Sequence, residues 1–269
     1  MTTATAPAPY RTPRGVRRAL TVVAAVMALL FVAWGTINVL QLLTRHTTTE
    51  VETFRDVTAL VVEDSSDIEL TSAPAGAPLE VRARVTESLV TPDRRARRRD
   101  DGTLVLSSSC SPTLFAEWCG VDYEIRVPAG TAIEARTTAG DIHAQNLRTT
   151  APAELHSSAG DITVVGAVAP SLRLTTSAGD VRASGLHVDR VVADSSAGDV
   201  ETSLQELPER LDTHSSAGDI RIVVPDAVYR VQTRTNAGDI DAQEIRTSPN
   251  APRSIRAVTS AGDIRIEAR

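Results

Sequence analysis

Residues 215–220 read SSAGDI, and this phrase returns six more times, with small changes, between residue 137 and the C-terminus. The other copies read TTAGDI (137–142), SSAGDI (157–162), TSAGDV (176–181), SSAGDV (195–200), TNAGDI (235–240) and TSAGDI (259–264). Their glycines are separated by 20, 19, 19, 20, 20 and 24 residues, and they are Gly140, Gly160, Gly179, Gly198, Gly218, Gly238 and Gly262. A phrase that returns at a nearly constant interval of this length indicates a repeat architecture.

Each copy carries the pattern of a half-buried strand on both sides of its Gly-Asp pair. The residue two places after the glycine is always Ile or Val, and the next residue is polar. Seven places before the glycine the residue is always apolar: Ile133, Ala153, Leu172, Val191, Leu211, Val231 and Ile255. Alternation with a period of two predicts strands, whereas a helix would need apolar residues three and four apart.

The remaining positions of the phrase indicate a turn with an ordered interior. Glycine permits a positive φ, and an adjacent Asp can bond to turn amides. Three places before every glycine stands Ser or Thr, which the alternation places inward. We expect these hydroxyls to hydrogen-bond to one another along the stack, because buried polar groups are normally paired.

Two all-β architectures fit this alternation. In a β-solenoid each copy of about 20 residues is one coil, and in a meander each Gly-Asp turn closes a hairpin. The equal copy lengths and the small residues at the corner favour the β-solenoid, with seven copies over residues 131–269. Pro249, Asn250 and Pro252 predict a loop before the last copy. Charged Arg265 and Glu267, with Arg269, are expected to blunt an open edge formed by the final strand.

Residues 44–130 are expected to form a degenerate β region that caps the repeats. Strand patterns occur at 59–62, 79–82, 103–106 and 123–127. Ser65-Ser66-Asp67-Ile68 resembles the repeated phrase without its Ala-Gly.

Residues 19–43, ALTVVAAVMALLFVAWGTINVLQLL, contain no ionisable side chain. A helix of this length rises roughly 37 Å, which exceeds the ~30 Å hydrocarbon core of a membrane. Arg11, Arg14, Arg17 and Arg18 precede it, so the sequence predicts a single-pass helix with residues 1–18 in the cytoplasm and the C-terminal part outside the cell. The alternative to a retained membrane helix is a cleaved signal peptide. Ala33-Trp34-Gly35 weakly resembles a cleavage site, but the apolar run continues beyond these residues.

The only two cysteines, Cys110 and Cys119, follow the apolar segment. Outside the membrane such a pair is expected to form a disulfide, with free buried thiols as the alternative. Two thiolates alone cannot complete a zinc site. The five histidines are scattered along the sequence, although the alternation places His156 and His214 in one outward row. We expect no cofactor.

The aspartates that follow the repeated glycines are the main candidates for a binding site. They are Asp141, Asp161, Asp180, Asp199, Asp219, Asp239 and Asp263. If they stack about 4.8 Å apart, neighbouring carboxylates repel by roughly 1 kcal/mol in water, so hydration, turn amides or a cation must relieve the repulsion. Capping of the turn is the main expectation. A calcium ladder and a polysaccharide contact are the alternatives, although the glycine-rich calcium nonapeptide is absent.

The distribution of charge argues against nucleic acid as the main partner. The net charge is -6, and the chain is acidic beyond its first 45 residues. The basic cluster Arg94, Arg95, Arg97, Arg98 and Arg99 is expected to be a solvated hairpin loop. Binding of this cluster to anionic wall polymer or lipid headgroups is the alternative.

These features together resemble a bacterial family of candidate adhesins, abundant in actinobacteria, that carries a domain of unknown function. The residues that carry the resemblance are Val121-Asp122-Tyr123, Val127-Pro128-Ala129-Gly130, the seven repeated phrases, Val224-Pro225, Tyr229-Arg230-Val231 and Trp34-Gly35. The resemblance covers about residues 15–269. It implies a β-solenoid on the outer face of the membrane, and it brings no catalytic residues.

We therefore expect a surface-displayed, non-catalytic interaction module, adhesin-like, whose partner is cell-wall polymer or another envelope protein. The acidic residues belong to the repeat itself, and no G-x-S-x-G, H-E-x-x-H or phosphate-loop motif occurs. One alternative is an accessory protein of envelope stress signalling. The other is a polysaccharide-active enzyme, because β-solenoids can support such chemistry.

Overall fold

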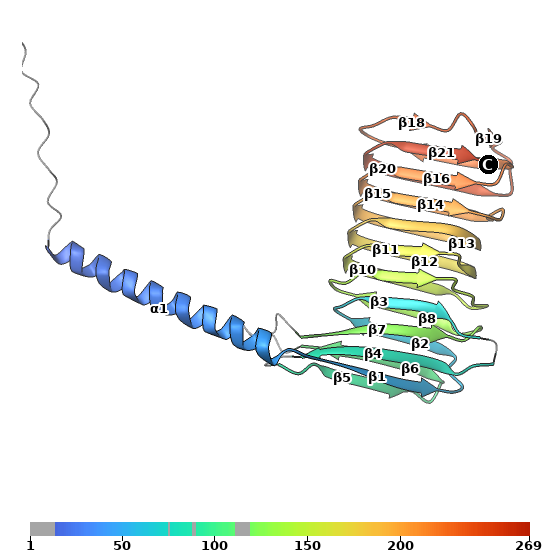
Figure 1. Cartoon of the computed structure of the whole chain (residues 1–269). Coiled ribbons are helices and arrows are strands. Elements are labelled where there is room, and N and C mark those ends of the chain that lie inside the picture. Colours follow the sequence, from blue (N-terminus) through green and yellow to red (C-terminus); the bar gives the residue numbers. More distant parts are fainter. Residues whose placement is uncertain (1–13, 75, 88–89, 111–118) are drawn as a thin grey trace, which may run out of the picture. The chain divides into compact units, whose positions relative to one another are not determined.

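A computed structural model describes residues 14–74, 76–87, 90–110 and 119–269 of the chain. The chain divides after Arg45 into two compact units. The first contains helix α1 (Arg14–Thr44), and the second contains all the strands that the structure describes (Figure 1).

Helix α1 is long and apolar enough to cross a membrane. Its apolar part, Leu20–Thr44, has 25 residues and a mean hydropathy of 2.3. The hydroxyl of Thr36 donates to the carbonyl of Val32 at 3.0 Å, and the amide of Asn38 donates to the carbonyl of Trp34 at 2.8 Å. These bonds satisfy polar groups that would be costly in hydrocarbon. The helix has the length and composition of a single-pass anchor or of a signal sequence.

Each copy of the repeat contributes one strand before its Ala-Gly-Asp corner and one strand after it. The strands before the corner form a leading face: β8 (Ala132–Thr137), β10 (Ala153–Ala159), β12 (Val168–Ala178), the second half of β13 (Val181–Ala197), β15 (Arg210–Ala217), β17 (Val228–Arg234) and β20 (Ser254–Ala261). The strands after the corner form a trailing face: β9 (Ile142–Gln145), β11 (Ile162–Val165), the first half of β13, β14 (Val200–Leu204), β16 (Ile220–Val224), β18 (Ile240–Asp241) and β21 (Ile264–Ala268).

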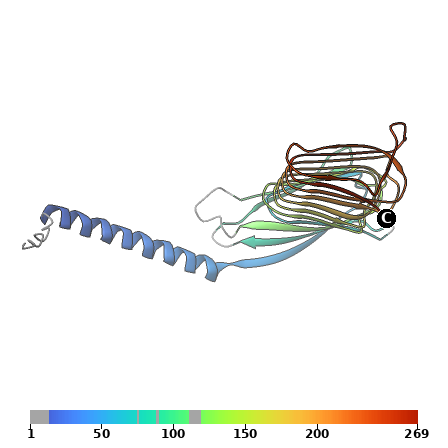
Figure 2. The same ribbon diagram turned by 90° about the horizontal axis from the view of Figure 1, so that it is seen from above.

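Consecutive copies pair in parallel and in register. Ile133 lies beside Ala153, which lies beside Leu172, and the row continues through Val191 and Leu211. Figure 2, a view along the stack, shows the coils lying over one another. The predicted β-solenoid is confirmed and the meander is wrong, because hairpins would have paired neighbouring copies antiparallel.

The last two copies stack in the reverse of their order in the sequence. Strand β20 pairs with β15 on one edge and with β17 on the other, and β21 lies likewise between β16 and β18 (Figure 1). We call residues 228–247 the end coil and residues 254–268 the C-terminal coil. Strand β19 (Arg246–Thr247) belongs to the end coil, and the predicted proline-containing loop joins the two coils.

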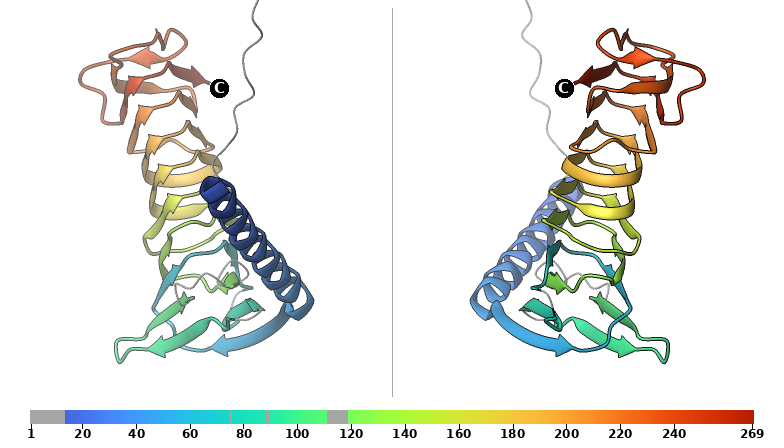
Figure 3. Two further views of the ribbon diagram at one scale, coloured as in Figure 1. Left: turned by 90° about the vertical axis from the view of Figure 1, so that its left-hand side faces the viewer. Right: turned by 90° about the vertical axis from the view of Figure 1, so that its right-hand side faces the viewer.

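This order corrects one expectation about the edge of the stack. Arg265, Glu267 and Arg269 do not blunt an open edge, because the C-terminal coil is enclosed between two other coils. The outer edge belongs to the end coil instead (Figure 3).

Residues 46–127 form the cap, which consists of two further coils and three closing strands. Strands β2 (Ala59–Asp64) and β3 (Ile68–Ser72) pair with β8 and β9, and β6 (Thr103–Ser109) and β7 (Gly120–Val127) form the next coil. Strands β1 (His46–Phe54), β4 (Leu79–Glu87) and β5 (Asp93–Arg98) pair antiparallel and close this end. The capping region is therefore continuous with the repeats, since its strands extend the same stack.

The core consists of thin rows of aliphatic side chains. Ile142, Ile162, Val181, Val200 and Ile220 stack in one row and are each at most 1% exposed. Burial of one such side chain stabilises the fold by roughly 1.5–3 kcal/mol, so each added coil contributes to a continuous core. This arrangement explains how a chain with 3% aromatic residues forms a core.

The repeated glycines are required by the close approach of neighbouring coils. A Cβ atom on Gly198 would lie 2.0 Å from the carbonyl oxygen of Gly179, and one on Gly160 would lie 2.2 Å from that of Gly140. Gly198 also has a φ of +149°, which other residues rarely adopt. A larger residue would have to push two coils apart.

We predict that Gly198→Ala lowers the free energy of unfolding by at least about 3 kcal/mol, through backbone overlap and unfavourable φ together. Gly185→Ala is the matched control. Its φ is +65°, but the nearest atom to its Cβ is 3.4 Å away, so we expect a loss of only about 1 kcal/mol. Chemical denaturation of the full chain in detergent measures both, and equal losses would refute the close-approach argument.

Candidate functional site

The repeated aspartates form a hydrogen-bonded column along one corner of the solenoid. Except at Asp239, which ends the column, the Oδ1 atom of each carboxylate accepts a hydrogen bond from the backbone N–H of the aspartate in the next coil, at 2.8–2.9 Å. In stacking order from the cap, this aspartate ladder is Asp67, Asp141, Asp161, Asp180, Asp199, Asp219, Asp263 and Asp239. The amide of the neighbouring coil thus supplies the relief from carboxylate repulsion.

The repeated hydroxyls make the second bond of the corner. Six of the seven donate to the carbonyl of the glycine in the preceding coil, all at 3.0 Å: Ser157 to Gly140, Thr176 to Gly160, Ser195 to Gly179, Ser215 to Gly198, Thr259 to Gly218 and Thr235 to Gly262. Thr137 donates to the carbonyl of Ser66 at 2.9 Å. The expectation that the hydroxyls bond to one another is wrong. At the corner the glycine carbonyl accepts from no strand amide, and the hydroxyl fills that place.

Backbone bonds complete the corner. Gly179 N–H donates to the carbonyl of Ala197 in the next coil, and Val181 N–H donates to the carbonyl of Asp199. The hydroxyl residue, the alanine, the glycine, the aspartate and the aliphatic residue of the phrase therefore each make a hydrogen bond at the junction between coils. This geometry matches the turn-capping expectation for the aspartates.

The ladder lines a shallow groove near the open end of the stack. The groove has a volume of about 550 Å³ and is lined by Asp199, Glu201, Asp219, Arg221, Asp239, Asp241, Asp263 and Arg265, with apolar atoms of Val200, Ile220 and Ile264. Within the described part of the chain, no group of three or more His, Cys, Asp or Glu side chains is placed to hold a metal ion. The groove presents alternating charges to a polar partner.

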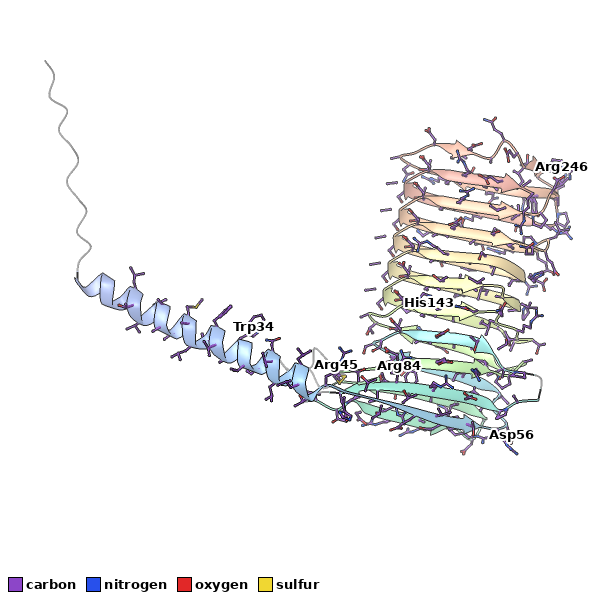
Figure 4. All side chains as sticks on the ribbon, in the orientation of Figure 1. Trp34, Arg45, Asp56, Arg84, His143 and Arg246 are labelled. Carbon is purple, nitrogen blue, oxygen red and sulfur yellow. A yellow bond between two sulfur atoms is a disulfide. The ribbon has the colours of Figure 1, made fainter. Side chains whose placement is uncertain are left out.

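The ladder also extends into the cap, beyond the residues that the repeat identified. The backbone of Asp67 hydrogen-bonds to Asp122, and burial, followed by the negative charge of Asp67, raises the pKa of the Asp122 carboxyl. Asp67 and Asp122 line a second, smaller groove. Arg84 and His143 line this groove too, and Figure 4 shows both side chains. Val121-Asp122-Tyr123 supplied the sequence signal for this position, since Tyr123 aligns with the apolar residue after each corner.

The outward histidines do not form a site. The register places His156 and His214 in one row of the leading face, as alternation predicted, but Thr175 and Asp194 stand between them. Burial raises the pKa of the Asp194 carboxyl, and the nearby His214 opposes this shift.

The basic cluster differs from its expected form. Arg94–Arg98 lie in strand β5, and only Arg99 belongs to the hairpin turn that follows. Arg94 forms ion pairs with Glu50 and Glu52, so part of the positive charge is neutralised within the cap.

Cys110 and Cys119 form a disulfide with their Cα atoms 6.1 Å apart. The bridge joins the end of β6 to the start of β7, at the place where the repeats carry Ala-Gly-Asp. The intervening residues 111–118 lie outside the described part of the chain. A covalent link therefore holds a corner that the repeated phrase does not form.

Sequence reasoning missed a buried acid beside this disulfide. Asp64 is 6% exposed and aligns with Thr137, so it occupies the hydroxyl position of its coil. Its Oδ1 atom accepts hydrogen bonds from Ser65 N–H at 2.7 Å and from the hydroxyl of Ser108. Its Oδ2 atom and the hydroxyl of Tyr123 are buried without a partner among the described residues. Burial raises the pKa of Asp64 to about 6, against the opposing effect of Ser108.

We predict that Asp219→Ala destabilises the stack by about 1 kcal/mol, because the N–H of Asp263 loses its acceptor. Asp219→Asn keeps an oxygen at the Oδ1 position and removes one charge from the column, so it should preserve stability. Thermal denaturation with and without calcium measures both effects. A large stabilisation by calcium that Asp219→Asn removes would show that the ladder binds the cation and would overturn the turn-capping interpretation.

The raised pKa of Asp64 predicts a pH dependence with a definite sign. Its folded pKa of about 6 exceeds the ordinary value of 3.8, so the folded state binds the proton more tightly. The stabilisation is complete below about pH 3.8 and is lost as the pH rises to about 6, at a cost of roughly 3 kcal/mol.

Asp64→Asn should therefore be more stable than the natural chain at pH 7.5 and should lose this advantage near pH 4. The free energy of unfolding, measured at both pH values, checks this prediction. Exposed Asp100→Asn is the control and should show no such crossover. A constant difference between Asp64→Asn and the natural chain at both pH values would contradict the prediction.

Several solved structures resemble the chain at low identity. A candidate adhesin from Bacteroides fragilis NCTC 9343 is 14% identical, with a TM-score of 0.46, and the match covers 82% of this chain and 97% of that one. A candidate cell adhesion protein from Clostridium sporogenes ATCC 15579 is 12% identical, with a TM-score of 0.40, over 83% and 100%. A candidate lipid binding protein from Parabacteroides distasonis ATCC 8503 is 12% identical, with a TM-score of 0.42, over 82% and 96%.

No curated protein matches the chain. The model of one protein family does match, and its match runs from residue 64 to residue 267, through both the cap and the seven copies of the repeat. The chain therefore belongs to the Toastrack DUF4097 family.

Proposed function

We propose that this protein is a non-catalytic interaction module, anchored in the membrane by α1, that displays residues 46–269 outside the cell to bind cell-wall polymer or another envelope protein. The observation that carries the proposal is the parallel, in-register pairing of the strands that flank each corner. It sets outward side chains in straight rows, such as Thr163, Arg182 and Glu201 on the trailing face. A surface that repeats at one-coil spacing suits a partner that is itself extended or repetitive.

The positions of the ionisable residues support a non-catalytic role. The aspartates of the ladder recur in every coil, and each uses one oxygen to cap its neighbour. Catalysis usually depends on a single constellation with perturbed pKa values in an enclosed cleft. The acid with the most clearly raised pKa, Asp64, lies inside the cap with its free oxygen buried.

Two features support display outside the cell. Four arginines precede the apolar helix, which favours a cytoplasmic N-terminus. The disulfide between Cys110 and Cys119 is typical of an oxidising compartment.

The orientation can be tested with the full chain in intact cells. A membrane-impermeant maleimide should label Ser196→Cys, on an exposed corner, and should not label Thr5→Cys in the N-terminal tail. The reverse pattern would contradict display outside the cell.

For binding, the full chain in lipid nanodiscs is mixed with purified wall polymer and, separately, with detergent extracts of the envelope. We expect retention by one of them that weakens with salt, because the outward rows are charged and exposed. The double variant Arg221→Glu/Arg265→Glu on the trailing face, compared with Arg173→Glu on the leading face, identifies the face that binds. Retention by neither preparation would count against the proposal.

A further inference from the structure

The end coil leaves one edge of the stack open. Within the described part of the chain, β18 pairs only with β21, and residues 230–234 of β17 pair only with β20. Some inward side chains of this coil lose part of their cover as a result, and Val231 and Ala242 are only half-buried. Ile240 is 44% exposed, whereas Ile264 in the coil below it is 1% exposed.

Strand β19 pairs with residues 228–229 and β18 is only two residues long, but no antiparallel strand of the described residues covers the rest of this edge. The opposite end of the stack is closed by the antiparallel strands of the cap. The end coil instead keeps the full phrase TNAGDI and has no proline between Val228 and Asp241. In the coil of Gly218, the glycine carbonyl accepts from the hydroxyl of the next coil, and the Oδ1 atom of Asp219 accepts from the aspartate N–H of the next coil. The equivalent acceptors of the end coil are the carbonyl of Gly238 and the Oδ1 atom of Asp239. The edge is therefore built to receive one more coil.

The C-terminal coil carries the groups that fit this edge. On its lower side, Thr259 donates to the carbonyl of Gly218 at 3.0 Å, and Asp263 N–H donates to Asp219 at 2.8 Å. On its upper side, the carbonyl of Gly262 accepts from Thr235. Because the end coil presents the same acceptors as the coil of Gly218, the C-terminal coil could bind there in the same register.

The C-terminal coil can also leave its place without unthreading the chain. Within residues 46–269, its covalent connection to the rest of the stack is the loop of residues 248–253. The chain advances 13 residues from Gly198 to Leu211, and over this length it passes from one coil to the adjacent coil. The segment from Gly218 to Val231 has the same length. The end coil can therefore close onto the coil of Gly218 after the C-terminal coil departs.

We propose that the C-terminal coil of one molecule exchanges onto the open end coil of a second copy of this chain. The donor molecule loses two coil contacts, regains one when its end coil closes, and gains one on the acceptor. The number of contacts is conserved, so exchange follows the local concentration of the protein, which is high for chains confined to one membrane. This inference concerns self-association; it rests on the membrane anchoring proposed above but not on the proposed binding of a wall polymer or envelope protein.

Cysteine trapping in membranes that contain two variants tests the exchange. The pairing of Ala237 with Ala261 places exposed Asn236 and Ser260 side by side, at a separation that a disulfide can span. Chains with Asn236→Cys are co-expressed with chains that carry Ser260→Cys, so a disulfide between the two positions must join two molecules. Ser196→Cys is the matched control, because it lies in the same column on a coil that cannot leave.

We expect at least about tenfold more covalent dimer from the Asn236→Cys and Ser260→Cys pair than from the Asn236→Cys and Ser196→Cys pair. A chain carrying both Asn236→Cys and Ser260→Cys should lock its own C-terminal coil and remain monomeric. Ile240→Asp should lower the dimer yield at the open edge. Val165→Asp should leave the yield unchanged, since Val165 is 46% exposed on an outward row. Equal yields from the two cysteine pairs, or an unchanged yield with Ile240→Asp, would overturn the proposal.

Discussion

The structure depends on the contact between corners of successive coils. The carbonyl of one glycine comes so close to the next glycine that no Cβ atom fits between them. This approach brings the aspartate N–H within reach of the preceding carboxylate and the hydroxyl within reach of the preceding glycine carbonyl. Glycine, aspartate and the hydroxyl residue are thus requirements of one junction, and the aliphatic rows inside can stack because that junction is short.

In the bonds made by the repeated hydroxyls and by the aspartate carboxylates, the donor always lies in the coil farther from the cap, which makes the two ends of the stack chemically different. At the capped end, the ladder passes through Asp67 to Asp122 and ends among antiparallel strands. At the other end, the carbonyl of Gly238 and the carboxylate of Asp239 remain as acceptors on an edge with exposed apolar side chains. A parallel stack cannot terminate itself, so each end needs its own solution.

The cap is where the rules of the repeat are broken. A disulfide replaces the Ala-Gly-Asp corner, Asp64 replaces a hydroxyl, and Tyr123 replaces an aliphatic residue. Asp64 and Tyr123 each leave a buried polar atom without a partner among the described residues. Stability lost at these positions is offset by the covalent bridge and by the broad pairing of β1 and β4. Asp64, whose pKa burial raises to about 6, thus lies at the end of the stack that follows the helix in the chain.

The sequence by itself determined the coil, because a phrase repeated every 19–24 residues and an alternation of period two leave few other ways to bury the aliphatic rows. It also determined which residues form the corner, since glycine and aspartate recur there in all seven copies. Only the tertiary structure decided the partners of these residues and the order of the last two coils. Near-identical phrases carry no information about which copies are neighbours in the stack. The sequence of residues 254–268 therefore does not predict that they lie between residues 228–247 and the coil of Gly218. The burial of Asp64 was likewise decided by packing. From the sequence alone, a single aspartate is expected to lie on the surface, and only the register with Thr137 places it inside.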